Sequence, residues 1–411
     1  MRQPQYTLTR DHAHARAAHL IEAHLRLADY GRTCPAPALV RLLCAAGAWL
    51  TSLSDACRRL RRAPSRETAR KALHATLPGA DELQRRLNAA LRDGLPKALR
   101  RRPQVLAADL TLVPYHGEPQ PGAGGEVYRG RAKEGTSPFH AYATLYAAHR
   151  GRRFTLALAR VRKGQPLSDV VRDLLRQGQR AGVRPGLLLL DRGFFNVGVV
   201  RYLQAARCPF LILMPCRGRK PSHPRGPGGT QRHCYRKRSR WDEHTWTDNG
   251  GRRATVGVCV RVGRPKRRRR PGRHARPKGT SRPFAFWGLR PPSYRWVEQT
   301  YRRRFGIESS YRQLRQAKVR TATRSALLRL LYVGVALLLR NVWVWLHDTY
   351  LAERRRGGRV PRPGRLRFQA LLLWLAHVAE QAFGVCDETT AAVPIPGDLP
   401  AGGPTPAPCN Y

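Results

Sequence analysis

Acidic residues are scarce in this chain of 411 residues, which has 26 Asp and Glu against 77 Lys and Arg and a formal net charge of +51. So large an excess of one sign repels itself and disfavours the compact state. A polyanion neutralises the excess and releases its own counterions as it binds. We therefore expect nucleic acid as the partner, ahead of an anionic membrane surface, and not a small neutral substrate.

Paired cysteines are also lacking, because the nine cysteines are scattered and form no CxxC motif. This spacing disfavours a disulfide framework and a zinc site. Cys216, His223, His233 and Cys234 are conceivable metal ligands, but we do not expect them to bind a metal. The cysteine pattern is typical of a reduced, intracellular protein.

Long uncharged apolar runs are absent. The first residues lack the apolar core of a signal peptide. The longest apolar stretch, 327–346, is interrupted by Arg329, Arg340 and Asn341, which indicates a buried helix and no membrane span. We expect a cytoplasmic protein that associates with the nucleoid.

The length suggests two or three domains, and 42% hydrophobic residues indicate a globular chain. Residues 1–100 have a helical pattern. Ser52 can cap a short helix that runs to Leu60, and Ser65 can cap a second helix rich in Arg and Lys. Residues 52–75 therefore resemble a DNA-binding helix-turn-helix, although a plain helical bundle gives the same pattern.

Strands begin at Val105. The runs 105–113, 139–149 and 152–162 are rich in β-forming residues, and the last two predict a hairpin. A helix at 168–181, a buried strand at 186–190, a helix at 197–206 and a buried strand at 209–215 follow. This order suits a mixed sheet of the ribonuclease H-like kind, an α/β core within an α+β chain.

Residues 216–282 carry 22 Lys and Arg against three acids and include the run PKRRRRP at 265–271. We interpret the region as a basic insertion with strands near 255–262 and 282–289, in contact with the DNA backbone; a solvated loop is the alternative. Helices are predicted at 294–318, 325–351 and 368–383. The predicted domains are 1–100, 101–215, 216–290, 291–352, and 353–411, the last with a basic linker and a disordered Pro-rich tail.

Three acids occupy positions where acids are poorly tolerated. Asp109 interrupts an apolar strand, Asp191 ends the run LLLL, and Glu308 lies on a helix among cations. Carboxylates in such places are costly unless paired or bound to metal. Two divalent cations held by carboxylates can activate the attacking oxygen and stabilise the leaving oxygen in phosphoryl transfer. We therefore predict a site for two Mg²⁺ ions at these acids, where Mn²⁺ can substitute.

Each acid also has a structural interpretation. Asp109 could be a strand-end or bulge residue, and Asp191 could cap the following helix. Glu308 could form a salt bridge with Arg304 or Arg312 along one helix. The order of the three acids, strand, strand end and helix after an insertion, favours the catalytic interpretation.

The chain resembles the insertion-sequence DDE transposases of the subgroup with a Tyr-Arg-Glu-Lys signature. The signature reads Tyr, two residues, Arg, three residues, Glu, six residues, Lys. Tyr301, Arg304 and Glu308 match it, and Arg315 takes the place of the Lys, with Lys318 one turn further on. The Asp-x-Gly-Phe motif matches Asp191, and Asp109 followed by a polar residue matches the first motif.

The resemblance covers about 105–320 and implies a ribonuclease H-like fold with a β-rich insertion between Asp191 and Glu308. It also implies that Tyr301 and Arg304 grip a phosphate beside a flipped base, and that Arg315 or Lys318 contacts DNA. Some members stack the flipped base on a Trp of the insertion. Trp287 is the candidate we choose for that role, and the others are Trp241, Trp246 and Trp296.

The implied reaction is cut-and-paste transposition, in which strands are cleaved at the terminal inverted repeats and joined to target DNA. Cutting two ends together requires a homodimer on DNA. A non-catalytic DNA-binding derivative of a transposase and a nuclease that cuts without joining are the alternatives.

Overall fold

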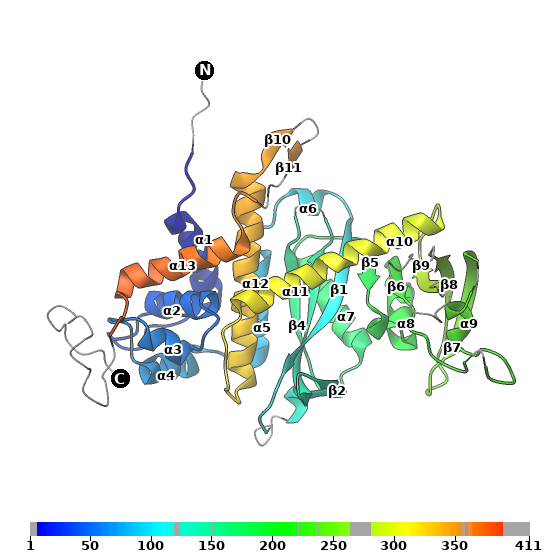
Figure 1. Ribbon diagram of the computed structural model, residues 1–411, viewed down its shortest axis with the longest axis horizontal. Coiled ribbons are helices and arrows are strands. Elements are labelled where there is room, and N and C mark those ends of the chain that lie inside the picture. The colour runs from blue at the N-terminus through cyan, green and yellow to red at the C-terminus, as the bar shows by residue number, and fades with distance from the viewer. Residues whose placement is uncertain are drawn as a thin grey trace, which may run out of the picture. The chain divides into compact units, whose positions relative to one another are not determined.

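The computed structural model describes residues 6–118, 124–149, 152–220, 222–236, 238–263, 281–355, 358–360, 362 and 364–388. The run at 265–271 and the Pro-rich tail lie outside these residues. The chain divides into two compact units (Figure 1). The helical unit comprises Met1–Asp93, Gly117–Pro121 and Arg312–Tyr411, and the sheet unit comprises Gly94–His116 and Gly122–Tyr311.

The helical unit is arranged around one long apolar helix, α12 (Ala326–Leu346). It packs against α5 (Ala80–Arg92), α1 (Arg10–Leu25) and α2 (Ala36–Ala48). α13 (Phe368–Phe383) packs against α2 and α1. The remaining helices of this unit are α3 (Leu53–Arg58), α4 (Arg66–Thr76) and the π-helical turn η4 (His347–Leu351). The helical pattern predicted for the N-terminal region is confirmed.

The apolar stretch forms the buried helix that the sequence predicts. It is long and apolar enough to cross a membrane by composition, but 89% of its most apolar window is buried inside the protein. Arg340 is only 2% exposed, and its Nε donates to Gln313 Oε1 at 3.2 Å. The Nε of Arg329 likewise donates to the carbonyl of Thr323. The charged residues in the run are therefore bonded within the core.

Both predicted caps are observed in the helix pair α3 and α4. The Ser52 side chain accepts from Asp55 N, and the Ser65 side chain accepts from Thr68 N. α3 ends at Arg58, two residues earlier than predicted. The two helices pack together, as in a helix-turn-helix, and DNA binding by this pair stays a prediction.

The basic segment after α12 is more regular than expected. Instead of a plain linker, β10 (Glu353–Arg355) and β11 (Gly358–Val360) pair as an antiparallel hairpin. Glu353 accepts from Arg362 and Arg365. The density of Arg and Gly in this segment concealed the strands.

The sheet unit contains the elements that the sequence predicts after Val105 and two further strands. Its elements are α6 (Ala98–Arg101), β1 (Gln104–Pro114), η1 (Gly124–Glu126), β2 (Tyr128–Lys133), β3 (Thr136–Ala147), β4 (Thr155–Val161), α7 (Leu167–Arg180), β5 (Pro185–Leu190), η2 (Arg192–Phe194), α8 (Val197–Ala205), β6 (Phe210–Leu213), α9 (Gln231–Cys234), β7 (Arg240–Thr247), β8 (Arg253–Val262), β9 (Ser281–Trp287), α10 (Tyr294–Arg302) and η3 (Arg303–Phe305). α11 (Gly306–Ala317) begins in this unit. β2 and β7 were not predicted, because their charged residues mask the alternation.

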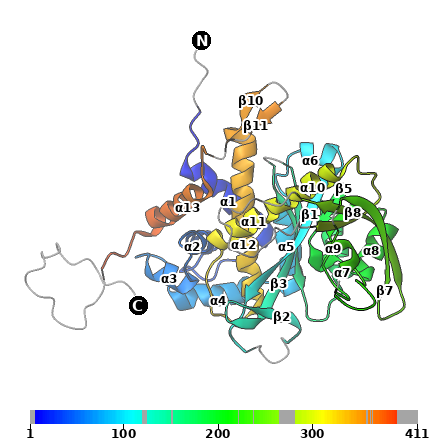
Figure 2. The same cartoon turned by 45° about the vertical axis from the view of Figure 1, so that its right-hand side comes forward.

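One mixed sheet runs through the unit in the order β2-β3-β1-β5-β6-β9-β8-β7, with β4 also paired to β3. β1, β5 and β6 are parallel, and the remaining pairs are antiparallel. The predicted hairpin is the antiparallel pair β3 and β4. The strands of the basic insertion continue this sheet, because β9 pairs with β6 and β8 pairs with β9. β7 and β8 form a long ribbon at this end of the sheet (Figure 2).

Helices cover both faces of the sheet. Consecutive residues of a strand point to opposite faces. Gly178 of α7 lies against Leu145, whereas Gly306 of α11 lies against the hydroxyl of the next residue, Tyr146. α7 and α11 therefore cover opposite faces. Under α10 and α11 the core contains Ala107, Leu189, Leu211, Phe284, Val297, Tyr301 and Ile307.

Cys216 and Cys234 form a disulfide, contrary to the expectation of unpaired cysteines. The intervening segment folds back on itself, since Arg217 N donates to Thr230 Oγ1 and Gln231 N donates to Arg217 O. The two Cα atoms are thereby brought to 6.1 Å, within the range that a disulfide spans. A separation of 18 residues without a motif gave no sign of this closure.

Candidate active site

Two of the three predicted acids meet because of strand register. Ala108 of β1 pairs with Leu190 of β5 in parallel. The next residue in each segment is an acid, Asp109 within β1 and Asp191 directly after β5. The two acids therefore lie side by side on neighbouring strands. Asp191 is the first residue after β5, and it caps η2 without a side-chain hydrogen bond. The carboxyl ends of parallel strands are where α/β sheets hold their ligand sites.

Glu308 reaches these two acids from the helix above the sheet. α10, η3 and α11 follow one another without a break, as the predicted helix 294–318 requires. A Cβ on Gly306 would lie 2.6 Å from the Tyr146 hydroxyl, so glycine permits the close approach of α11 to β3. That approach places Glu308, two residues later, in the same pocket as Asp109 and Asp191.

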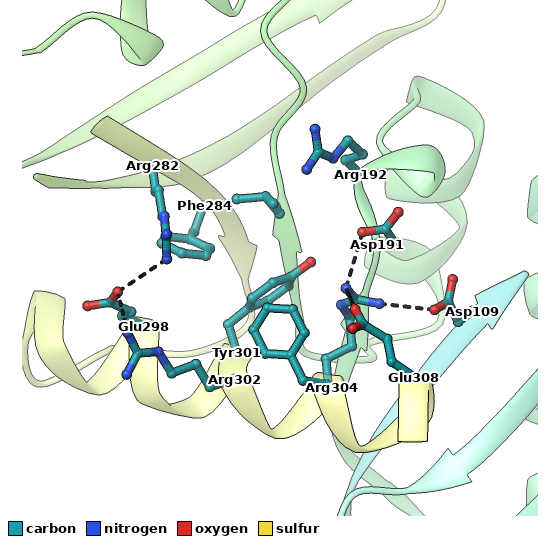
Figure 3. A pocket seen from close by; sticks show the side chains of 12 residues that line it. Asp109, Asp191, Arg192, Arg282, Phe284, Glu298, Tyr301, Arg302, Arg304 and Glu308 are labelled. Atoms are coloured by element: carbon teal, nitrogen blue, oxygen red, sulfur yellow. Dashed lines mark hydrogen bonds and ion pairs between the residues drawn. The ribbon is translucent and has the colours of Figure 1, made fainter. Parts of the chain in front are cut away.

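The guanidinium of Arg304 lies at the centre of the three carboxylates (Figure 3). Its Nη1 is 3.0 Å from Asp109 Oδ2. Its Nη2 is 3.1 Å from Glu308 Oε1 and 3.5 Å from Asp191 Oδ1. The Arg304 side chain is only 6% exposed, while that of Glu308 is 53% exposed. The salt-bridge interpretation of Glu308 is therefore observed, within a cluster that joins all three acids.

The pKa values of two members of this cluster, Asp109 and Arg304, are shifted. Burial raises the pKa of Asp109 to about 6, an effect that Arg304 opposes and the charges of Asp191 and Glu308 reinforce. Burial alone would lower the pKa of Arg304, but Tyr301 and the acids raise it above its ordinary value. The carboxylates thus lie close enough to repel one another, and the guanidinium screens that repulsion.

The cluster lines one end of a pocket of about 420 Å³. Within the described residues, no three His, Cys, Asp or Glu are arranged so that they could hold a metal ion. The three carboxylates have the oxygen donors that magnesium prefers, and they already surround one cationic group. Their chemistry therefore fits magnesium, provided that the Arg304 side chain leaves the centre.

The other end of the pocket is basic. Glu298 of α10 accepts ion pairs from Arg302 at 3.2 Å, Arg261 at 3.4 Å and Arg282 at 3.5 Å. Figure 3 shows Arg282 and Arg302 pointing to Glu298, away from Asp109 and Glu308. This group was not predicted from the sequence, because only the pairing of β8 with β9 makes Arg261 and Arg282 neighbours.

Tyr301 supports the site from beneath. Its side chain is buried, and its hydroxyl donates to Leu190 O at 3.1 Å, directly before Asp191. Arg304 lies over its ring, with the guanidinium carbon 5.5 Å from the ring centroid. In this conformation Tyr301 holds the β5 end and Arg304 holds the acids, so the predicted grip on DNA by these two residues stays a prediction.

Tyr311 and Thr144 fix the backbone of Asp109, and neither was a predicted site residue. The Tyr311 hydroxyl donates to Asp109 O at 2.8 Å, and Thr144 Oγ1 is 2.8 Å from the same hydroxyl. Thr144 is also the register partner of Asp109 on β3. A helical signal for Tyr311 existed, because it lies three residues after Glu308 on the same side of α11.

The tryptophans of the insertion divide between the two faces of the sheet. Phe284 packs against Tyr301 at 5.2 Å, so by alternation Trp287 points to the opposite face, away from the pocket. In this conformation Trp287 is therefore on the other face of the sheet from the acids, and its predicted stacking on a flipped base stays a prediction. Trp241 shares the face of Phe284, stacks on Tyr294 at 4.7 Å and is 41% exposed.

The two remaining tryptophans are structural in this conformation. Trp246 stacks on Phe195 with ring centroids 4.6 Å apart, and Trp296 packs against the core under α10. Arg315 is exposed near the end of α11, and Lys318 is half-buried just after it. Both belong to the helical unit, and their contact with DNA stays a prediction.

No protein-family model and no curated protein matches the chain. Among solved structures, the fold is similar to that of the piggyBac transposase, determined by cryo-EM as a synaptic complex with hairpin DNA. The TM-score is 0.53 at 10% sequence identity, and the match covers 93% of this chain and 82% of that chain. At this identity the likeness concerns the fold.

The chain therefore has a mixed α/β fold, consistent with the ribonuclease H-like fold of transposases. The predicted fold class is confirmed. The Tyr-Arg-Glu-Lys subgroup stays a prediction, because the similar structure carries no information on that signature.

Proposed function

We propose that the chain is a DNA transposase that cleaves the ends of its element and transfers the strands to target DNA. The observation that carries the proposal is the meeting of Asp109, Asp191 and Glu308 in one pocket. They come from a central strand, the end of the parallel neighbour strand and a helix after the insertion. The fold similarity to a transposase supports the same function.

Magnesium is the proposed cofactor, as two ions for which Mn²⁺ can substitute, held by Asp109, Asp191 and Glu308. When bound there, the metal would stabilise charge on the attacking and leaving oxygens of a phosphodiester. Arg304 must first turn away from the acids, because its guanidinium contacts all three. A DNA phosphate is a suitable new partner for it, since a guanidinium binds phosphate through paired N–H donors.

Two tyrosines beside the acids position these groups. Tyr301 and Tyr311 hold the backbone at Leu190 and Asp109, so Asp109 and Asp191 keep their places while Arg304 moves. The buried ring of Tyr301 also gives Arg304 an apolar surface to lie on. Preorganisation of this kind limits the rearrangement needed when the substrate binds.

Double-stranded DNA is the proposed partner, as terminal inverted repeats and as target. The net charge of +51 supports it, and so does the DNA in the complex of the similar transposase. A homodimer on DNA is proposed because two element ends must be cut together. A cytoplasmic, nucleoid-associated location follows from the same partner.

A non-catalytic DNA-binding protein derived from a transposase is the second candidate. The observation that favours it is the position of Arg304, whose guanidinium contacts all three acids in the described conformation. In the second candidate Arg304 stays on the acids when DNA binds, whereas in a transposase it has to leave them.

The test is strand cleavage by the purified full chain, with Mg²⁺ and a duplex that carries the terminal repeat found beside the reading frame. We expect nicking by the wild type, its loss in Asp191→Asn and its persistence in the control Asp169→Asn. Asp169 is a suitable control because it pairs with Arg172 on α7, away from the pocket. Nicking without joining would indicate a nuclease, and DNA binding without nicking would indicate the second candidate.

A further inference from the structure

Arg261 of β8 and Arg282 of β9 are directly paired across two antiparallel strands. Like charges in this position are destabilising unless something compensates them. Arg282 lies two residues before Phe284, so both arginines point to the face that α10 covers. Local propensity offers no reason for such a pair, and a role in binding would supply one.

Glu298 is the compensating group, and it is insufficient. It forms ion pairs with Arg261, Arg282 and, one helical turn further on, Arg302. One carboxylate therefore serves three guanidinium groups, which leaves an excess of two positive charges. Glu298 is 17% exposed, whereas Arg282 and Arg302 are 52% and 60% exposed, so the acid lies beneath and the arginines face solvent.

The ion pairs also leave donors available. Each guanidinium has five N–H donors in a rigid fork that matches phosphate. The contacts of Arg282 and Arg302 with Glu298 are single ones, at 3.5 and 3.2 Å. Glu298 thus positions the two guanidinium groups while most of their N–H donors make no contact with it.

The charges in the pocket are segregated. At one end three acids surround Arg304, and at the other end Arg282 and Arg302 pair with Glu298 (Figure 3). Arg192, directly after Asp191, also lines the pocket. A DNA strand with one phosphodiester at the acids would carry another phosphate towards the arginines.

We propose that Arg282 and Arg302, positioned by Glu298, bind a backbone phosphate of the DNA strand whose neighbouring phosphodiester lies at the three acids. This inference rests on the proposed function and adds a subsite to it. Arg282 and Arg302 are the binding residues, and Glu298 is a positioning residue.

The experiment is a scan with single methylphosphonates, which remove the charge of one phosphate at a time. The probes are terminal-repeat duplexes, bound by the full chain in Ca²⁺, and the readout is the dissociation constant at several salt concentrations. In the wild type, we expect affinity to fall at one position near the cut. In the double variant Arg282→Gln/Arg302→Gln, a methylphosphonate at that position should not lower the affinity further. Methylphosphonates at the other positions should have the same effect as in the wild type.

The salt dependence gives a second measure. Neutralising one phosphate fewer should reduce the slope of log affinity against log salt by about 0.9 in the double variant. Arg131→Gln is the matched control, since Arg131 is an exposed arginine of β2 in the same unit. It should leave the methylphosphonate profile of the wild type unchanged.

Glu298→Gln separates positioning from charge. It removes a negative charge, so overall DNA affinity should not fall. The loss of affinity on methylphosphonate substitution should no longer be confined to one phosphate and should be shared with the neighbouring positions. A profile in the double variant that equals the wild-type profile at every position would overturn the subsite. Arg302→Gln alone, at a 60% exposed residue, covers the case in which the double variant does not fold.

The subsite and the proposed function fail in different ways. If the wild-type protein did not cleave DNA in the assay above, the proposed transposase function would be refuted. The methylphosphonate profile could still be measured, because binding in Ca²⁺ needs no cleavage. If the wild type cleaved DNA but the arginine variants had the wild-type methylphosphonate profile, only the phosphate subsite would be refuted.

Discussion

The Nη1 atom of Arg304 lies 3.0 Å from Oδ2 of Asp109, and the same guanidinium contacts the other two acids of the site. An arginine thus occupies the position at which the three carboxylates converge. Its charge reduces their mutual repulsion, and its burial at 6% exposure shows that this is a packed arrangement. Under the proposed function, magnesium and the guanidinium would compete for the same oxygen atoms.

We predict that Arg304→Gln makes the stability of the protein depend on magnesium. Without divalent ions the variant should lose about 2 kcal/mol or more of its free energy of unfolding, because the partly buried acids lose their cation. Millimolar Mg²⁺ should restore much of the loss, while the wild type should respond little. Thermal unfolding with and without Mg²⁺ measures both effects.

Arg302→Gln is the control for this experiment, since Arg302 lines the same pocket but pairs with Glu298. It should show no magnesium dependence beyond that of the wild type. A wild-type protein that magnesium stabilises as strongly as Arg304→Gln would refute the competition between guanidinium and metal.

We predict that Tyr311→Phe slows cleavage without weakening DNA binding. The lost hydroxyl donates to Asp109 O and contacts Thr144, so the variant loosens the strand that carries the acid. The loss should destabilise the fold by about 1 kcal/mol. Cleavage rate, DNA affinity and chemical denaturation are to be compared with those of Thr144→Val.

The two residues share one hydrogen-bonded unit, so the effects of Tyr311→Phe and Thr144→Val should not add. A double variant whose stability loss equals the sum of the single losses would argue against the shared unit.

The sequence predicted the acids of the site better than their surroundings. Asp109 and Asp191 were recognisable because each carboxylate interrupts or ends an apolar strand, and Glu308 because it fits a spaced signature. Local patterns of this kind depend on neighbours in the chain. The contact of Arg304 with all three acids depends on the approach of α11 to β1 and β5, which no local pattern encodes.

The basic insertion shows the same limit. β8 and β9 were predicted from their apolar residues, but their pairing with β6 in the main sheet was not. The register of these strands decides that Trp287 points away from the pocket and that Arg261 meets Arg282. Register follows from long-range pairing, and a shift of one residue exchanges the two faces.

We predict that Gly306→Ala destabilises the sheet unit by about 1–3 kcal/mol, as overpacking of a close contact does. An added Cβ would lie 2.6 Å from the Tyr146 hydroxyl, so the buried Tyr146 side chain, α11 or β3 must shift. The cleavage rate should fall by more than the loss of folded protein accounts for, because a shift of α11 also displaces Glu308. Chemical denaturation and the cleavage rate measure the two effects.

Gly125→Ala is the matched control, because a Cβ on Gly125 meets nothing within 4 Å. Equal behaviour of the two alanine variants would contradict the close packing at Gly306.

We predict that reduction of the Cys216–Cys234 disulfide lowers stability by about 3 kcal/mol, the effect expected for closing a loop of this length. Cys216→Ser/Cys234→Ser should be destabilised to the same extent. A thiol reductant should lower the melting temperature of the wild type by more than that of the double variant, which keeps the disulfide-bonded Cys386. An equal response of both proteins would show that another cysteine is responsible.

We predict that acid destabilises the sheet unit through His244. Burial and the neighbouring His233 lower the pKa of His244 to about 4. The folded protein therefore keeps this ring neutral, while the unfolded chain takes up a proton near the ordinary value of 6.5. This contribution of His244 to the free energy of unfolding, up to about 3 kcal/mol, is fully present above pH 6.5 and is lost as the pH falls towards about 4.

His244→Phe should flatten this pH dependence, because it keeps a ring against Trp246, 5.2 Å away, and removes the titrating group. His116→Gln, at an exposed histidine of the same unit, should leave the dependence as in the wild type. Denaturant unfolding at a series of pH values gives the slopes. If His244→Phe retained the full acid slope, another group that is neutral in the folded state, such as the buried His233, would have to carry it.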